Sequence, residues 1–213
     1  MLPYINGRGV EHLVHFTRIE NVRSILESGL VGRTDLDAAG INYTPNDCHR
    51  FDYQPNATCL SISFPNYKMF YRLRMENPEL DWAVIRLSPE IVKDKRCAFA
   101  YVNAATREIA HSDIEVRMQK PALESMFADH DGMPMRNTLN IPDSYTTNPQ
   151  AEVLCLDGIE PQYIRDVVFD AKDRVKNQPL VRALARDHNA IAKFQYGPSL
   201  FMPRRDHAHW KGR

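Results

Sequence analysis

The sequence has no long apolar run. Nowhere in its 213 residues is there a stretch approaching the roughly 20 consecutive apolar residues that a membrane-spanning helix needs. Residues 1–16 also lack a basic segment followed by an apolar one, the pattern of a secretion signal. We therefore expect no membrane contact and a cytoplasmic location.

Cysteine is scarce, and its spacing does not indicate a metal site. The four cysteines form no C-x-x-C pair and show no zinc-like spacing with histidine. They are Cys48, Cys59, Cys97 and Cys155. The last three lie in apolar, strand-like segments, which is typical of buried thiols in a reducing compartment. The sequence therefore predicts free thiols and no metal.

The common motifs of nucleotide-binding and hydrolytic enzymes are also absent. There is no G-x-G-x-x-G after a strand and no G-x-x-x-x-G-K-[ST], which disfavours a Rossmann dinucleotide fold and a P-loop. Neither G-x-S-x-G nor H-E-x-x-H occurs, so a hydrolase nucleophile elbow and a zinc-protease helix are not indicated.

Net charge is zero, because 27 basic residues balance 27 acidic ones. The exception is residues 180–213, where seven Lys and Arg face only Asp187 and Asp206, a net +5. Such a tail can contact phosphates, or can simply be a solvated terminus. We therefore divide the chain into a domain over residues 1–179 and a basic C-terminal helix or tail over 180–213.

Hydrophobic periodicity predicts an α+β fold. Strands are expected over 59–64, 82–87, 97–102, 151–156 and 164–169, and short helices over 67–75, 89–92, 123–126 and for about ten residues after Pro179. Residues 33–56 and 129–149 are polar and rich in turn formers, which is typical of functional loops. The strands occur in clusters and do not alternate strictly with helices, so antiparallel pairing is favoured.

The segment from His15 to Leu30 predicts a strand that leads directly into a helix. Thr17 suits the N-cap, with Glu20 completing a capping box, and Gly29 suits the helix end. A helix N-terminus after a strand presents backbone N–H groups that suit a diphosphate or a carboxamide. The same pattern also occurs at ordinary strand–helix junctions.

Two charged residues stand out further along the chain. Glu152 opens an apolar strand, where a carboxylate at the rim of a cleft can act on a developing cation or an attacking group. Arg50 lies in the first long loop, where its planar guanidinium could hold a diphosphate. The alternatives are a solvent-facing edge glutamate and a surface arginine.

Four sequence blocks, taken together, resemble one known family. They are HFTRIENVRSILESGL, SFPNYKMFY, YVNAAT and NPQAEVLCLDGIEPQYI, and the resemblance extends over about residues 12–169. In their order the chain resembles the DarT-type ADP-ribosyltransferases, toxins that transfer ADP-ribose from NAD to a base of nucleic acid. The resemblance implies two small, mostly antiparallel sheets with flanking helices around an NAD cleft.

The resemblance also implies roles for individual residues. Glu152 would be the catalytic carboxylate and Arg50 the catalytic arginine. The expected NAD-binding residues are His15, Thr17, Asn21, Met69, Tyr71 and Asn103. The loop before Glu152 would recognise the acceptor, and the expected acceptor-binding residues are Phe51, Tyr53, Tyr67, Tyr145 and Gln150.

The implied activity is transfer of ADP-ribose to a base of single-stranded DNA, with thymine as the first expectation and guanine as the second. A base must leave its stack to be attacked, which favours a single strand. Three alternatives stay open: the same chemistry on RNA, modification of a protein side chain, and a non-catalytic nucleic-acid binder. A toxin of this kind also implies a protective antitoxin protein as a partner.

Overall fold

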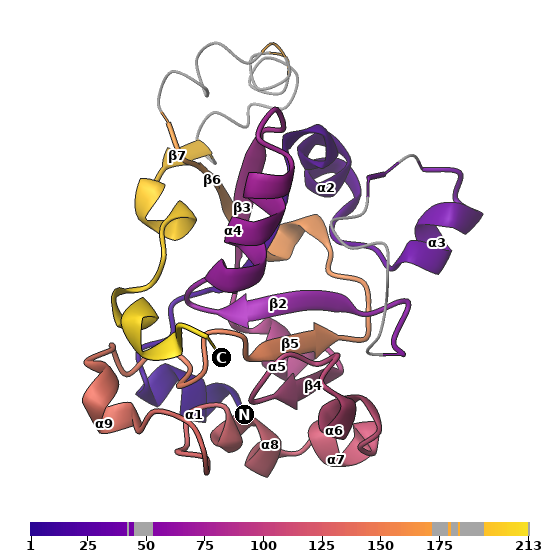
Figure 1. Cartoon of the computed structure of the whole chain (residues 1–213). Helices are drawn as coiled ribbons and strands as arrows, with labels where there is room; N and C mark the ends of the chain where they lie inside the picture. Colours follow the sequence, from indigo (N-terminus) through magenta and orange to yellow (C-terminus); the bar gives the residue numbers. More distant parts are fainter. Residues whose placement is uncertain (42, 45–52, 172–178, 180–182, 184–193, 213) are drawn as a thin grey trace.

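A computed structural model describes residues 1–41, 43–44, 53–171, 179, 183 and 194–212. Seven strands form one sheet in the order β4-β5-β2-β1-β3-β6-β7 (Figure 1). The strands are β1 (Leu13–Arg18), β2 (Thr58–Ile62), β3 (Trp82–Leu87), β4 (Cys97–Ala100), β5 (Glu152–Cys155), β6 (Ile164–Phe169) and β7 (Phe194–Tyr196). All neighbours are antiparallel except β6 and β7, which are parallel.

Short helices surround the sheet. The α-helices are α1 (Leu2–Gly7), α2 (Val22–Ser28), α3 (Arg33–Ala38), α4 (Tyr67–Glu76), α5 (Ile91–Asp94), α6 (Arg107–Ala110), α7 (Ile114–Arg117), α8 (Lys120–Ser125) and α9 (Arg136–Leu139). The 3₁₀ turns are η1 (Ile19–Asn21), η2 (Pro161–Tyr163), η4 (Pro198–Phe201) and η5 (Arg205–Trp210). Among the described residues, no helix has the length and apolar character needed to cross a membrane.

The expectation of two separate sheets is wrong, because β1 joins the two halves. Its six residues all pair with β3, from Leu13↔Leu87 to Arg18↔Trp82. With β2, in contrast, only Leu13 and Val14 are in register, opposite Ile62 and Ser61. Beyond Val14 the two strands therefore diverge within one continuous sheet, and this opening becomes the wall of the site.

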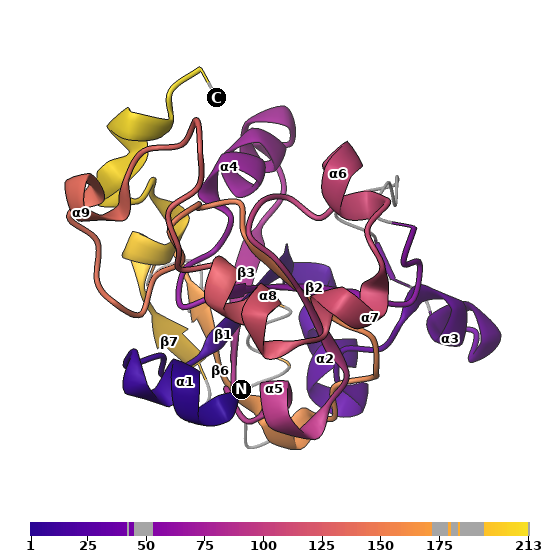
Figure 2. The same cartoon turned by 90° about the horizontal axis from the view of Figure 1, so that it is seen from below.

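Apolar residues on both sides of the sheet form its cores. One face is covered by α1, α2, α5 and α8, whose buried side chains meet β1, β2 and β3 (Figure 2). On the other face, Phe70 of α4 and Phe201 of η4 pack against Val14, Trp82 and Val168. A third cluster packs α6 and neighbouring residues against β4 and β5.

The predicted antiparallel strands are confirmed within a few residues at each end. The two long polar loops are more ordered than predicted, since α3 forms within residues 33–56 and α9 within residues 129–149. Strand β7 was not predicted. It has only three residues and forms by pairing with β6, and so short a segment carries no clear strand pattern of its own. Most of the helix predicted after Pro179 falls outside the described residues; Pro179 and Ala183, which are described, are helical.

Candidate active site

A cavity of about 200 Å³ lies where β1 and β2 diverge. Its walls come from β1, β2, one side of α2, the segment between α2 and α3, and the N-terminal end of α4. The polar lining residues include His15, Thr17, Asn21, Ser24, Ser28, Ser61, Asn66, Asn103 and Glu152. Apolar side chains such as Ile25, Leu36 and Met69 line the same space. This mixture of an apolar wall and a few convergent polar groups is typical of a small-molecule site.

Glu152 is fixed at the inner wall of this cavity. Its side chain comes from the first residue of β5, and the residue is only 7% exposed. The Asn103 Nδ2 donates to Oε1 at 3.1 Å, and the Ala104 backbone N donates to Oε2 at 2.9 Å. Because β4 pairs with β5 at Ala100↔Glu152, the chain leaving β4 brings Asn103 and Ala104 to the carboxylate.

His15 bridges the opening between the two strands. Its Nδ1 lies 2.9 Å from the Cys59 carbonyl oxygen of β2. A carbonyl only accepts hydrogen bonds, so Nδ1 carries the proton in this contact. The imidazole thus replaces a backbone ladder bond that the diverging strands cannot make.

Thr17 does not cap the helix, so the predicted capping box is wrong. Its backbone continues the β1 ladder opposite Ala83, and the chain then enters η1, which has Arg18 at its N-cap position and no side-chain cap. The Thr17 hydroxyl instead accepts from Asn21 Nδ2 at 3.1 Å. Both side chains line the cavity.

Asn21 also holds the edge of the cavity formed by residues 43–44. Its Nδ2 donates to the Thr44 carbonyl at 2.9 Å, and its Oδ1 accepts from the Thr44 backbone N at 3.1 Å. This pair of bonds copies the pairing of two backbone amides. The Asn21 side chain therefore orders a segment that is 23 residues away in sequence.

Gly29 is needed where α2 turns back toward the sheet. Its φ is +83°, and a Cβ at this position would lie 2.0 Å from the Ile159 carbonyl oxygen. The next residue, Leu30, forms a two-way backbone bridge with Ile159. The predicted need for glycine at the helix end is confirmed by this positive φ. The close approach at Gly29 lets Leu30, which lines the cavity, pair with Ile159.

On α4 the two expected NAD-binding residues lie in different environments. Met69 lines the cavity, and its backbone N donates to Oδ1 of Asn66, the N-cap residue of α4, at 3.2 Å. Tyr71 is 53% exposed and does not line the cavity. Two residues apart on a helix point about 200° away from each other, so one cavity cannot take both side chains.

The residues expected to bind the acceptor are more scattered. Tyr53 is exposed and packs edge-on against His111. Tyr67 is 8% exposed, so little of its ring is open to a base; burial and the charge of Asp206 raise its pKa to about 12. Arg50 and Phe51 lie outside the described residues.

Tyr145 and Gln150 belong to the loop before Glu152. The Tyr145 ring lies 5.5 Å from that of Phe64, and burial raises the pKa of its phenol. Arg136 of α9 donates to the Tyr145 carbonyl at 2.8 Å and to the Thr147 hydroxyl at 3.2 Å. The loop is therefore tied to its own α9 helix and is not a free polar segment.

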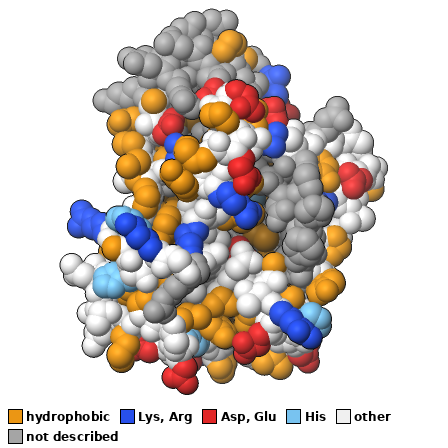
Figure 3. Space-filling model, viewed as in Figure 1, with side chains coloured by type: hydrophobic (Ala, Val, Ile, Leu, Met, Phe, Trp, Pro, Cys, Tyr) orange, Lys and Arg blue, Asp and Glu red, His pale blue; other side chains and the backbone are white. Residues whose placement is uncertain are grey.

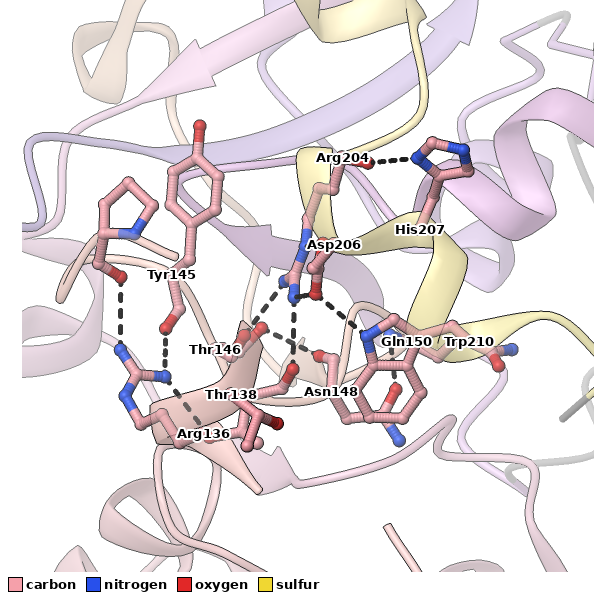
Figure 4. Close-up of polar contacts among 12 residues, drawn as sticks. Arg136, Thr138, Tyr145, Thr146, Asn148, Gln150, Arg204, Asp206, His207 and Trp210 are labelled. Carbon is pink, nitrogen blue, oxygen red and sulfur yellow. Dashed lines mark hydrogen bonds and ion pairs between the residues drawn. The ribbon is translucent and has the colours of Figure 1, made fainter. Parts of the chain in front are cut away.

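A second arginine reaches the same loop from the C-terminal segment (Figure 4). Arg204 is 3% exposed and donates to the Thr146 carbonyl at 2.9 Å and the Thr147 carbonyl at 3.1 Å. Sequence reasoning counted Arg204 and Asp206 only as tail charges. The sequence offered one sign of their burial, the i, i+2 spacing of the two charges close to the apolar Trp210. This pattern is too common to distinguish them from other tail residues.

Two other cations of the tail lie at the surface. Arg205 and Lys211 are exposed. In Figure 3, Lys, Arg and His side chains gather around the C-terminal segment and α4. Of the remaining tail cations, Arg182, Arg186, Lys193 and Arg213 lie outside the described residues.

The cavity, with a fixed carboxylate at its wall, has the features of a site for a small polar substrate. A family model described as ssDNA thymidine ADP-ribosyltransferase, DarT, matches residues 14–192. The chain belongs to this family, which confirms the resemblance drawn from the four sequence blocks. It is thus an NAD-dependent ADP-ribosyltransferase, and thymine in single-stranded DNA, the first expectation, agrees with the family's activity.

Solved structures agree in fold. Thermosipho africanus DarTG in complex with ADP-ribose is 19% identical with a TM-score of 0.57, over 90% of this chain and 51% of that chain. Thermus sp. 2.9 DarT in complex with carba-NAD+ is 13% identical with a TM-score of 0.58, over 91% and 98%. The same protein in complex with ADP-ribosylated ssDNA is 11% identical with a TM-score of 0.54, over 91% of this chain and 97% of that chain. The chain therefore spans about half the length of the Thermosipho protein, and no curated protein matches it.

Proposed function

We propose that this chain transfers ADP-ribose from NAD to a thymine of single-stranded DNA, with Glu152 as the catalytic carboxylate. The observation that carries this proposal is the position of Glu152. It is buried at the wall of the cavity, and both carboxylate oxygens are oriented by donors on the segment after β4. Such a fixed carboxylate can act without first reorganising.

The cavity lining fits NAD as the substrate. Asn21 and Thr17 offer amide and hydroxyl groups, and His15 offers a ring nitrogen, on the β1 side. Met69 supplies an apolar surface suited to the nicotinamide ring, and Asn103 lies beside Glu152. The proposal gives Arg50 the pyrophosphate, since a guanidinium can bind two phosphate oxygens at once.

The chemistry assigns two tasks to Glu152. As the bond between nicotinamide and ribose breaks, nicotinamide leaves as a neutral molecule with the bonding electron pair, and positive charge develops at ribose C1. The carboxylate stabilises that charge. It then takes the proton from the ring N–H of the base, whose nitrogen forms the new bond to C1. Asn103 and Ala104 keep the carboxylate aimed throughout.

On the acceptor side, the base must be out of its stack. We assign it to the region of the loop before Glu152, with Tyr145, Gln150, Tyr53 and Phe51 as candidate contacts and Tyr67 as a buried support. The exposed Arg205 and Lys211 would contact backbone phosphates, which makes binding weaker at high salt. A toxin of this activity requires a protective partner, so an antitoxin protein belongs to the same proposal.

Intact mass measurement of short oligonucleotides tests the proposal. Single-stranded DNA, duplex DNA and RNA of matched sequence are incubated with NAD and either the wild-type protein or Glu152→Ala. We expect a gain of one ADP-ribose on single-stranded DNA that the variant does not produce. Labelling of RNA alone, or of protein alone, would replace the DNA acceptor with one of those classes.

A further inference from the structure

The C-terminal segment is joined to the loop before Glu152 through a buried ion pair. Arg204 Nε donates to Asp206 Oδ1 at 2.9 Å, and Nη2 donates to Oδ2. The Trp210 Nε1 donates to the same carboxylate at 2.8 Å. Arg204 and Asp206 are 3% and 1% exposed, so this cluster lies inside the protein (Figure 4).

Burying such a cluster to anchor a chain end costs free energy of desolvation. A buried ion pair adds little net stability over an apolar contact of equal size, because both charges must first lose their water. A guanidinium, however, adds direction, since its planar fork holds several acceptors in fixed positions. In this structure the fork points Nη1 and Nη2 at two consecutive loop carbonyls, those of Thr146 and Thr147.

Local hydrogen bonds connect Thr146 with Ala151, the residue before Glu152. The Thr146 hydroxyl donates to the Asn148 carbonyl at 2.9 Å. The Asn148 Oδ1 accepts from Gln150 N at 2.8 Å, and its carbonyl accepts from Ala151 N at 3.1 Å. The next residue is Glu152. The opposite side of the loop is held by the Thr147 N bond to the Met126 carbonyl at 3.0 Å.

We propose that Arg204 is a positioning residue that fixes the loop over residues 145–150 in the conformation that receives the acceptor base. The effect on the acceptor base rests on the proposed function. The hold of Arg204 on the loop, called the clamp below, rests on contacts between residues 57–58 apart in sequence. Arg204 does not line the cavity, and it donates to Asp206 and to the Thr146 and Thr147 carbonyls. Its effect therefore falls on the acceptor and not on NAD.

Arg204→Lys tests the proposal, because lysine keeps the positive charge beside Asp206 but cannot span both carbonyls. We expect the KM for a single-stranded oligonucleotide to rise about 10-fold or more, as expected for lost hydrogen bonds to a charged donor. The Kd for NAD, measured by calorimetry, should stay unchanged. A merely structural role would lower the fraction of protein that binds NAD as well.

Arg74→Lys is the matched control. Arg74 of α4 donates to the Phe201 carbonyl of the same C-terminal segment at 2.5 Å, but does not reach the loop. It should behave as the wild type toward the oligonucleotide. An unchanged oligonucleotide KM in Arg204→Lys, or an equal change in Arg74→Lys, would overturn the proposal.

Hydrogen exchange separates this inference from the proposed function. In Arg204→Lys we expect faster exchange confined to amides of residues 144–150. Faster exchange throughout the chain would overturn the clamp. If the wild-type protein modifies no oligonucleotide, the proposed function fails, and the exchange measurement still decides whether Arg204 holds the loop.

Discussion

The two sides of the candidate site are built in different ways. The NAD side is assembled from residues of neighbouring strands and the helix that follows, such as His15, Thr17 and Asn21 on one continuous segment. The acceptor side is a loop held by Arg136 from α9 and by Arg204 from the C-terminal segment. In Figures 1 and 2 this segment lies beside α9 and away from α2 and α3.

The two sides of the candidate site therefore depend on different parts of the fold. The NAD side depends on where β1 leaves β2, which the sheet itself determines. The acceptor loop depends on a few long-range bonds to side chains, so single substitutions in those side chains can reshape it. We therefore expect variants on the two sides to change different measurable quantities.

The largest effect is expected where the two sides meet, at Glu152. Glu152→Gln keeps the size of the side chain and one carbonyl oxygen but removes the negative charge and the proton acceptor. We expect transfer to oligonucleotides to fall by about 10²–10⁴-fold, with NAD binding retained. Single-turnover rates measure this, and Glu79→Gln, an exposed acid outside the cavity, is the control. Near-normal transfer by Glu152→Gln would contradict its assignment.

The next effect concerns the stability of the acceptor side. Burial alone raises the pKa of the Asp206 carboxyl, but hydrogen bonds from Arg204 and Trp210 outweigh burial and hold the pKa below its usual range. We expect Asp206→Asn to lower the free energy of unfolding by about 1–3 kcal/mol at neutral pH. Urea denaturation followed by tryptophan fluorescence measures this difference.

The pH dependence of that difference has a definite sign. A carboxyl whose folded-state pKa is depressed contributes stability that is complete above its unfolded pKa, about 4 for Asp, and is lost as the pH falls through the folded value. The difference between wild type and Asp206→Asn should therefore be constant from neutral pH down to about pH 4 and shrink below it. A difference that grows on acidification would be inconsistent with an ionised Asp206.

On the NAD side, Asn21→Ala removes three hydrogen bonds at once, one to Thr17 and two to Thr44. We expect the Kd for NAD to rise about 10-fold, and the oligonucleotide KM at saturating NAD to change little. Asn77→Ala is a matched control, because the Asn77 side chain donates to the Leu73 carbonyl at the end of α4 and the residue does not line the cavity. Equal losses in both variants would argue against a specific role for Asn21.

The smallest effect is expected at Tyr71. Because this side chain is exposed and outside the cavity lining, Tyr71→Ala should change NAD binding by less than about 0.5 kcal/mol. Met69→Ala, two residues earlier on α4, should weaken NAD binding measurably, since Met69 lines the cavity. Calorimetry on both variants compares the two faces of one helix, and a larger loss at Tyr71 would reverse the assignment.

Local patterns predicted much of the fold and several of the residues that line the cavity. The antiparallel strands and the glycine at the end of α2 follow from periodicity and backbone freedom. The contact between Asn103 and Glu152 was not predicted, although the family resemblance had named both residues. Two interpretations of local signals were wrong. Thr17 has the chemistry of a cap but remains in the β1 ladder, and the two expected sheets are joined through the full β1–β3 pairing.

The acceptor side could not be predicted in the same way. Arg204 is one of seven basic residues in the tail, and nothing next to it in sequence marks it as buried. Its partners Thr146 and Thr147 accept through backbone carbonyls, which carry no side-chain signature. Long-range bonds from a side chain to a backbone are visible only once the chain is folded.

The most direct test of the proposed activity is to locate the modification on DNA. Single-stranded oligonucleotides with one thymine, and matched ones with that thymine replaced by cytosine, are incubated with the protein and NAD and then fragmented in a mass spectrometer. We expect one ADP-ribose on the thymine base, none on the substituted strand, and none with Glu152→Gln. Labelling of both oligonucleotides at a base other than thymine, or labelling that persists in Glu152→Gln, would contradict the proposed activity.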